Sequence, residues 1–403
     1  MGIEDKKAFV DSYDPAGRNS DDIVVQEYID GRDFTCSVIE VGDGCITLAP
    51  YVYKTNEVQM KEKLLTFELK FDGKTCIEQL QKKPDPELFE RLQQVAIEAF
   101  VASGCKGSNM GCEVHLRARP DGKVFAIDVN PKPATFAPEG EFQDLPIIHS
   151  LPGGHPAVIN IFIANHMLRN AMQGSVLEKV ACAYDKVALQ YSRDDKNNVI
   201  TYACFRKLVN QFDFAGTVFD LACGTGSFGR ILFESKGRAS TRLIGFDISP
   251  RMLDICRSTG LYDATHIDSM ESTLAYYHCY AKSVDHVVCF SAVHFLRSEM
   301  FAFVLVLCFT LANKSITISV DDIPDQYNEN LKQRGYGFMY STNHIANMKS
   351  FGEPPGWRLT KGERQYSWTS PATGDDVYTT YFRFDRIPDA SRHLMFSTIE
   401  VLN

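Results

Sequence analysis

A glycine-rich turn between two apolar segments is the part of the sequence best suited to binding chemistry. Residues 218–230 read VFDLACGTGSFGR, and residues 243–249 read LIGFDIS. A strand, a glycine turn, a helix and a second strand that closes on Asp247 form the order of a nucleotide-binding βαβ unit. Gly224 and Gly226 let the backbone turn tightly and approach a ligand, because they carry no Cβ. Asp247 can accept hydrogen bonds from both hydroxyls of a ribose, so the pattern predicts an adenosine-containing cofactor.

An acid in the first strand separates two classes of cofactor. A glycine turn alone fits both a dinucleotide site and an S-adenosylmethionine (SAM) site. Asp220 lies four residues before the first glycine, and the small pair Ala222-Cys223 intervenes. A carboxylate there suits the cationic ammonium and sulfonium groups of SAM and suits a pyrophosphate badly. The segment therefore resembles the first motif of class I SAM-dependent methyltransferases. A nicotinamide-dinucleotide site and an unoccupied structural turn are the alternatives.

The resemblance implies further cofactor-binding positions. That family holds SAM with the glycine turn, the end of the second strand, the loop after the third strand, the end of the fourth strand and an N-terminal helix. The cofactor-binding residues carried over to this sequence are Tyr184, Tyr191, Asp220, Ala222, Gly224, Gly226, Asp247, Ile248, Met252, Asp268, Ser269, Met270 and Phe290. Tyr184 and Tyr191 equally suit a helix that only packs on the sheet, and Asp268 equally suits a solvated loop acid.

The resemblance leaves catalysis with few candidates. His294, just after the fourth predicted strand, is the candidate base, since its unperturbed pKa near 6.5 suits deprotonation of a hydroxyl or amine. The alternative is a histidine satisfied by a backbone carbonyl. Residues 325–344 form an insertion long and aromatic enough to be a lid over a small organic acceptor. Within it, Arg334 and Tyr336 are candidate substrate-binding residues, although Arg334 equally suits a surface position.

The first half of the chain predicts a different order of strands and helices. Apolar segments at 24–41 and 45–54 predict paired strands, Asp85-Pro86 predicts the start of a long amphipathic helix, and residues 111–133 predict a hairpin. This order resembles the C-terminal half of an ATP-grasp ligase such as D-alanine–D-alanine ligase. In that family the segment QEYIDGRDFT, which begins at Gln26, would bind adenine and ribose.

The departures from the ligase pattern bear on its function. Glu113 and His115 stand where the family carries an arginine and a metal-binding aspartate, and only about two dozen residues precede the hinge. Asp128 and Asn130 keep part of a hard-cation site, but one carboxylate is a poor magnesium cradle. We therefore expect no metal, and a remnant that serves packing, homodimer formation or the shaping of the acceptor pocket.

Length and composition limit the number of domains and the class of protein. The 403 residues, 44% hydrophobic and 23% charged, predict two globular domains, which we place at 1–174 and 175–403. A net charge of −9 without a basic stripe argues against nucleic acid as a partner. Twelve scattered cysteines, without a CxxC pair or a leader, indicate reduced thiols in a cytoplasmic protein. The longest apolar run, 301–312, is too short for a bilayer and predicts a buried helix, so no membrane association is expected.

The expected fold class is α/β. Strands at 217–222, 242–248, 283–290 and 315–320 alternate with helices and end in a hairpin at 362–385. The resemblance implies a Rossmann-like, seven-stranded methyltransferase sheet there, beside an α+β, ATP-grasp-like N-terminal domain.

The expected activity is methylation of a small-molecule acceptor in secondary metabolite biosynthesis. A carboxylic acid converted to its methyl ester is the first choice, because a carboxylate needs no base. Methylation of a phenol, hydroxyl or amine is the alternative. From other classes, a bifunctional ligase–methyltransferase and a noncatalytic SAM-binding scaffold stay open.

Overall fold

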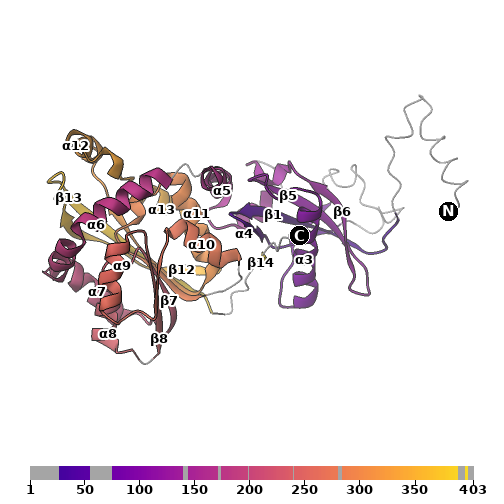
Figure 1. The fold of residues 1–403 in the computed structure, drawn as a ribbon. Helices are drawn as coiled ribbons and strands as arrows, with labels where there is room; N and C mark the ends of the chain where they lie inside the picture. The colour runs from indigo at the N-terminus through magenta and orange to yellow at the C-terminus, as the bar shows by residue number, and fades with distance from the viewer. Residues whose placement is uncertain are drawn as a thin grey trace, which may run out of the picture.

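Two β-sheets with flanking helices make up the molecule (Figure 1). The computed structural model describes residues 27–54, 75–138, 144–170, 174–197, 199–238, 240–279, 284–388 and 395–397. Residues 24–26 of the predicted first strand, including the hinge residue Gln26, lie outside the described residues.

The C-terminal half of the chain forms a seven-stranded sheet. Its strand order is β12 (Trp357–Thr369), β13 (Asp376–Arg386), β11 (Ala312–Asp322), β10 (Val284–Cys289), β7 (Gly216–Leu221), β8 (Thr241–Asp247) and β9 (Ala264–Ile267). The five strands from β11 to β9 are parallel, and β13 is antiparallel to both of its neighbours. The predicted Rossmann-like sheet with a closing hairpin is therefore confirmed.

The strand order reverses between β7 and β10. From β7 the chain runs outward through β8 to β9, then returns to β10 on the other side and continues to β11. The crevice at the carboxyl ends of the strands on either side of such a reversal is where open α/β sheets bind ligands. The fold thus directs attention to the residues that follow β7 and β10.

The helices of this half follow the sequence signals closely. Ser249 caps α9 by accepting the Met252 N–H at 3.2 Å, and Pro250 occupies the first helical position. The apolar run forms α11, in which every residue from Met300 to Leu311 is buried. The helices are α6 (Gly174–Asn197), α7 (Val199–Gln211), α8 (Ser227–Lys236), α9 (Pro250–Ser258), α10 (Met270–Cys279), α11 (Ser298–Leu311), α12 (Tyr327–Gln333) and α13 (Ile345–Phe351), with short 3-10 turns η4 (Val293–Phe295) and η5 (Gly337–Met339).

The first half of the chain forms the other sheet. In chain order it is the first sheet, and the sheet of the C-terminal half is the second sheet. The first sheet contains β1 (Arg32–Val41), β2 (Gly44–Thr47), β3 (Tyr51–Lys54), β4 (Cys76–Gln79), β5 (Gly111–Ala118) and β6 (Val124–Asn130), with the 3-10 turn η2 (Ala134–Phe136) after it. The predicted helix is α3 (Pro86–Ala102), and the Asp85 side chain accepts the Leu88 N–H at its start. The predicted hairpin is also confirmed, since β5 pairs with β6.

The two halves share one hydrophobic core. Helices α4 (Leu145–Ser150) and α5 (Gly154–Arg169) lie between the sheets, and α5 packs on α11. One cluster of buried side chains runs from β1 and β2 through α5 to α11 and the second sheet. The short strand β14 (Met395–Ser397), near the end of the chain, pairs with β2 in the first sheet. The division at residue 174 stays a prediction, because elements from both sides of it share this core.

Candidate active site

The glycine turn after β7 forms an open cradle. Ala222 adopts φ 56°, a left-handed conformation that is costly for a residue with a Cβ, and Gly224 and Gly226 adopt φ 56° and 87°. A Cβ on Gly226 would lie 3.0 Å from the Tyr262 ring, whereas a Cβ on Gly224 would point into open space. The turn is therefore closed on the side of Tyr262 and open on the side of Gly224, where a ligand can approach the backbone.

Asp247 ties the glycine turn to the second strand. Its Oδ2 accepts the Gly224 N–H at 2.9 Å, and its Oδ1 accepts the Ser249 N–H at 2.8 Å. Burial raises the pKa of this carboxyl above its usual value. The two oxygens together can accept about four hydrogen bonds, so the carboxylate can still accept ribose hydroxyls.

Asp220 is a buried acid with a partner that the sequence did not reveal. Its side chain is 2% exposed, and its Oδ2 accepts a 2.5 Å hydrogen bond from the Tyr262 hydroxyl. Burial raises the pKa of Asp220 to about 7, against the opposing effect of that hydrogen bond. Tyr262 follows α9 in a loop and belongs to no recognisable motif, so only the fold brings it to the site.

The third predicted segment lies beside Asp247. The Asp268 N–H donates to the Asp247 backbone carbonyl at 3.1 Å, and the Asp268 carboxylate accepts the Ser269 N–H and the Thr273 hydroxyl at 2.8 and 3.1 Å. Ser269 accepts the Ser272 N–H at the start of α10. Burial raises the pKa of Asp268. These bonds hold the carboxylate at the strand edge where adenine recognition was predicted.

The apolar positions predicted to wall the adenine lie around the same edge. Ile248 is half-buried, Met252 is 2% exposed at the start of α9, and Met270 packs against the main hydrophobic cluster. Their contact with a cofactor stays a prediction.

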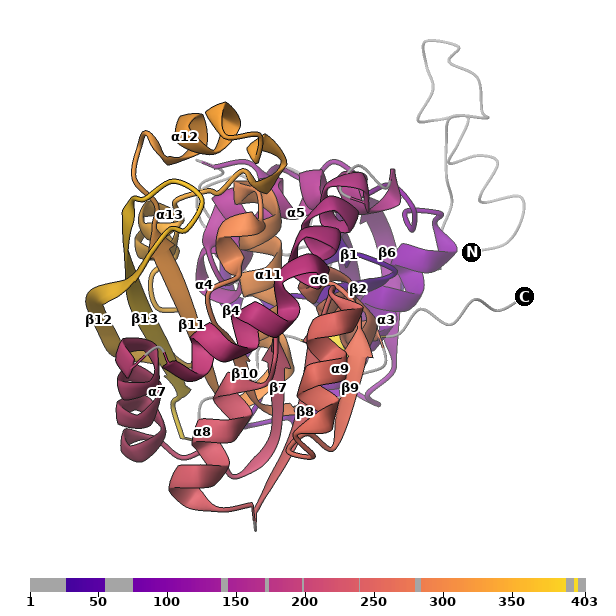
Figure 2. The same cartoon turned by 60° about the vertical axis from the view of Figure 1, so that its left-hand side comes forward.

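Helix α6 folds over this edge. The Tyr184 ring lies edge-on to Tyr191 and to Phe295 of η4, with both centroid distances 6.1 Å. Asp185 accepts the Ser249 hydroxyl at 2.6 Å and the Arg251 N–H at 3.0 Å. Both views of the ribbon show α6 beside α9 (Figures 1 and 2). The helix therefore connects the cofactor side of the crevice to the loop after β10.

His294 lies in η4 and has a carboxylate partner. Its Nδ1 is 2.9 Å from Oδ2 of Asp321, near the end of β11, and the side chains are 7% and 0% exposed. The two atoms are close enough for an ion pair, but their angles are not those of a hydrogen bond. The Thr379 hydroxyl donates to Oδ1 of Asp321 at 2.5 Å. Ser291, between β10 and His294, adopts φ 53°. Strain in the backbone thus occurs at Ala222 and Ser291, just beyond the two strands that flank the reversal.

The sequence carries a local signal for Asp321, which belongs to none of the motifs described above. Asp321 ends an apolar run, SITISVDD, as Asp220 and Asp247 end theirs. An acid at the carboxyl end of a buried parallel strand lies at the ligand-binding edge of the sheet.

Three other predicted residues lie in different surroundings. Phe290 is 9% exposed, and its ring packs against Phe205 and Phe228 with centroid distances of 4.7 and 5.3 Å. Arg334 is exposed at the end of α12, and Tyr336 is 44% exposed. The insertion that carries them touches the site, since the Thr342 N–H donates to the His294 carbonyl at 2.7 Å and η5 contacts α6. Direct ligand contacts of the three stay predictions.

In the ligase-like half, Glu113 and Asn130 are engaged in hydrogen bonds within the protein, whereas Asp128 is exposed. Glu113 accepts the hydroxyls of Thr35 and Thr135 at 2.5 and 3.1 Å. Asn130 accepts the Lys132 N–H at 3.0 Å, and Asp128 is exposed on β6 opposite His115. Among the described residues, no three His, Cys, Asp or Glu side chains are grouped to hold a metal ion.

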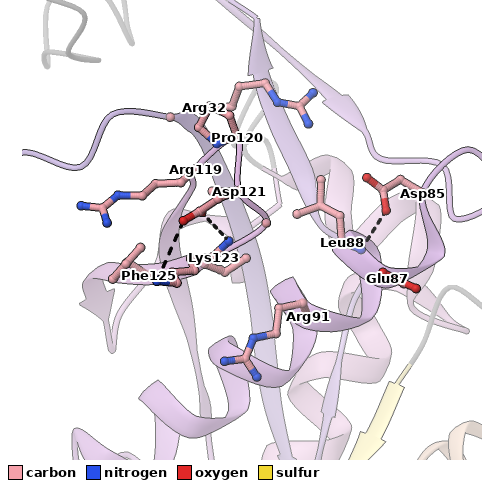
Figure 3. Close-up of a pocket in the computed structure, with 14 residues that line it drawn as sticks. Arg32, Asp85, Glu87, Leu88, Arg91, Arg119, Pro120, Asp121, Lys123 and Phe125 are labelled. Carbon is pink, nitrogen blue, oxygen red and sulfur yellow. Dashed lines mark hydrogen bonds and ion pairs between the residues drawn. The ribbon is translucent and has the colours of Figure 1, made fainter.

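A groove of about 1100 Å³ lies at the turn between β5 and β6, facing the start of α3 (Figure 3). Its charged lining mixes both signs: Arg32, Arg91, Arg119 and Lys123 with Asp85, Glu87 and Asp121. None of the predicted site residues lines it. In the described part of the chain, no helix has the length and hydrophobicity needed to span a membrane.

Two parts of the chain match different protein families. Residues 218–312 match the family model of a methyltransferase domain, and residues 3–137 match that of the D-ala D-ala ligase C-terminus. D-alanine–D-alanine ligase A of Mesorhizobium japonicum is 25% identical over 42% of this chain and 45% of the relative. The ligase of Fervidobacterium nodosum is 28% identical over 35% of this chain and 41% of the relative. The chain thus spans less than half the length of these curated relatives.

Solved methyltransferases are among the structural neighbours. Magnesium protoporphyrin IX methyltransferase of Synechocystis PCC 6803, solved with bound S-adenosylhomocysteine, is 15% identical with a TM-score of 0.40. The match covers 53% of this chain and 100% of that one. A SAM-dependent methyltransferase of Anabaena variabilis is 11% identical with a TM-score of 0.35, over 52% of this chain and 95% of that one.

The family match, the strand order and the cradle agree. The cradle is open at Gly224, and the carboxylates of Asp220 and Asp247 suit the cationic groups and the ribose of SAM, so the residues present fit this cofactor. The chain therefore carries a SAM-dependent methyltransferase domain, joined to a segment of the D-alanine–D-alanine ligase C-terminal family.

Proposed function

We propose that this protein methylates a small molecule whose accepting atom must first lose a proton, with His294 as the general base. The observation that carries the proposal is the 2.9 Å contact between Nδ1 of His294 and Oδ2 of Asp321. The negative charge of this carboxylate favours the tautomer with the proton on Nδ1, although the pair lacks hydrogen-bond geometry in this structure, and that tautomer leaves Nε2 to accept a proton from the acceptor. The described residues supply no hydrogen bond to Nε2.

The other residues of the site bind and orient. SAM supplies an electrophilic methyl group on a sulfonium. Asp220, Asp247 and the glycine turn would hold it, and the rings of Tyr184 and Phe295 would keep water from the reacting atoms. Fixing donor and acceptor in line can supply about 7–11 kcal/mol of the barrier, and a positioned base adds about 10²–10⁴-fold in rate.

The pair formed by His294 and Asp321 bears on which acceptor is methylated. The first choice from the sequence, a carboxylic acid, is ionised at neutral pH and has no use for a base. A phenol, hydroxyl or amine does need one. The His294–Asp321 contact thus supports the alternative acceptors, and formation of a methyl ester remains an untested prediction. Arg334, the predicted carboxylate partner, is exposed and has no described contact with His294.

The test combines product detection with two variants. Full-length protein would be incubated with a metabolite extract and deuteromethyl SAM, and labelled products found by mass spectrometry. We expect His294→Gln and Asp321→Asn to lower the labelling rate by about 10²–10⁴-fold, with SAM affinity unchanged in calorimetry. Asp322→Asn is the matched control, because Asp322 pairs with Arg364 on the surface.

Two results would overturn the proposal. An undiminished labelling rate in His294→Gln would show that His294 is not the general base. Tight SAM binding with no labelled small molecule would favour the noncatalytic scaffold.

For the ligase-like half we propose a structural role. Glu113 is held by two threonines, and Arg117 donates to Asp33 at 2.7 and 3.1 Å and to the Ile29 carbonyl at 3.0 Å. These bonds occupy backbone and side chains that the ligase resemblance assigns to nucleotide. Calorimetry with ATP and magnesium should detect no binding. Binding of ATP would support the hypothesis of a bifunctional ligase–methyltransferase.

The remaining sequence predictions also stand as proposals. They are a cytoplasmic location, a role in secondary metabolite biosynthesis, no nucleic-acid partner and a homodimer formed through the N-terminal half. Light scattering on the full chain would test the dimer.

A further inference from the structure

Carboxylates converge on the crevice from several strands. Asp220, Asp247 and Asp321 stand at or next to the carboxyl ends of β7, β8 and β11, which lie in one sheet on the two sides of β10. Within the described residues, no lysine or arginine forms an ion pair with any of the three. Among the described residues, His294 beside Asp321 is the one basic side chain paired with these acids, and neither Asp220 nor Asp247 has a cationic partner.

The negative charge of these carboxylates also affects a thiol at the centre of the sheet. Cys289 ends β10, and its pKa is raised by burial, then by the neighbouring Cys308 thiol, and then by the carboxylates of Asp220, Asp321 and Asp247. SAM has a net charge of one positive unit at neutral pH, from two cationic groups and one carboxylate. Asp220, with a pKa of about 7, carries only part of a negative charge at neutral pH, and a bound SAM would offset part, but not all, of the charge of the three acids.

Aromatic rings line the same place. Tyr184 lies edge-on to Phe295, the residue after His294, and the His294 and Phe295 ring centroids are 4.2 Å apart. Ring faces attract cations, most strongly where water is excluded. Aromatic rings and carboxylates next to a base suit an ammonium group, whereas a carboxylate or a developing phenolate would be repelled.

Resting on the proposed function, we infer that the acceptor is an amine that enters the crevice as an ammonium ion. Nε2 of His294 takes one proton from the ammonium nitrogen. The freed lone pair forms the nitrogen–carbon bond to the methyl group, the carbon–sulfur bond breaks, and its electron pair stays on sulfur. The products are a methylated ammonium ion and neutral S-adenosylhomocysteine, and His294 passes its proton to solvent.

The experiment sorts acceptors by charge. A metabolite extract would be separated on ion exchangers into cationic, anionic and neutral pools, and each incubated with full-length protein and deuteromethyl SAM. We expect the label in the cationic pool, in a product still retained by the cation exchanger. Label confined to the anionic or neutral pool would overturn the amine and leave the proposed function standing. Label in no pool, with SAM bound, would overturn both.

Once a labelled amine is isolated, Tyr184 provides a second check. At saturating SAM, Tyr184→Leu should raise the KM for the amine about fivefold or more, and Tyr184→Phe should leave it within about twofold, because the ring and not the hydroxyl attracts the cation. An equal rise in both variants would contradict the ring contact.

Discussion

At the scale of single residues, the site is built from acids that the fold has taken out of water. Asp220 and Asp321 are 2% and 1% exposed, and each keeps a hydroxyl donor, from Tyr262 and Thr379 respectively. An isolated buried carboxylate is costly, so such groups persist where a proton, a donor or a bound cation compensates. Their burial at the carboxyl ends of β7 and β11 supports the proposed binding site.

Asp220 gives a prediction about pH. Its pKa in the folded protein, about 7, lies above the usual value of 3.8 for an aspartate. Protonated Asp220 therefore favours the folded state, and this contribution is lost as pH rises through about 7. Since SAM binding favours the ionised form, we expect the SAM affinity of the protein to rise between about pH 6 and 8. Asp220→Asn should flatten that rise and make the cofactor-free protein relatively more stable at pH 8.

Calorimetry and thermal unfolding across this range would test it. Asp254→Asn is the control, because Asp254 lies on the surface of α9 and pairs with Arg257. An equal pH dependence in the wild type and Asp220→Asn would contradict the assignment.

At the scale of elements, the Asp185 side chain ties α6 to the start of α9. Asp185 accepts one bond from the hydroxyl and one from the backbone at the start of α9, where the positive end of the helix dipole adds to the attraction. The same helix carries Tyr184 and Tyr191. The position of the aromatic wall therefore depends on this contact.

We expect Asp185→Ala to weaken SAM binding by about tenfold, because bonds of this kind to a charged group contribute about 1.5–3 kcal/mol and part of that is recovered from water. The thermal midpoint without SAM should change little. Isothermal calorimetry would measure the affinity, with Lys186→Ala at the adjacent exposed position as control. Wild-type affinity in Asp185→Ala would show that α6 does not shape the cofactor site.

At the scale of the whole molecule, α11 explains why the two halves stay together. Its run FAFVLVLCFTLA has no polar face, and a helix that is apolar all round must be covered all round. The second sheet covers one side and α5 covers another. Helix α5 is in turn anchored to the first sheet, because Asn165 donates to the Glu40 carbonyl at 2.7 Å.

Two isoleucines of α5 provide a test of whether the two halves of the molecule unfold together. Ile161 is fully buried in the shared cluster, whereas Ile159 is 51% exposed on the same helix. Ile161→Ala should lower the free energy of unfolding by about 2–5 kcal/mol, and Ile159→Ala by much less. Because the core is continuous, we expect one calorimetric transition that moves as a unit. Two transitions, with only one displaced by Ile161→Ala, would show that the halves unfold independently.

The sequence alone determined the local structure and the cofactor. The parallel strands, the capped helices α3 and α9 and the glycine turn follow from period, caps and glycine spacing, which are properties of neighbouring residues. Asp220 and Asp247 belong to the same short motif, so their proximity could be predicted without a fold.

Only the tertiary structure decided which distant residues complete the site. Tyr262 reaches Asp220 across 42 residues, Asp185 reaches Ser249 across 64, and Thr379 reaches Asp321 across 58. It also decided that β14 joins the first sheet and that α5 covers α11. Such pairings depend on strand order and on the packing of helix faces, and no local pattern encodes them, because each forms only when two separate surfaces exclude water together.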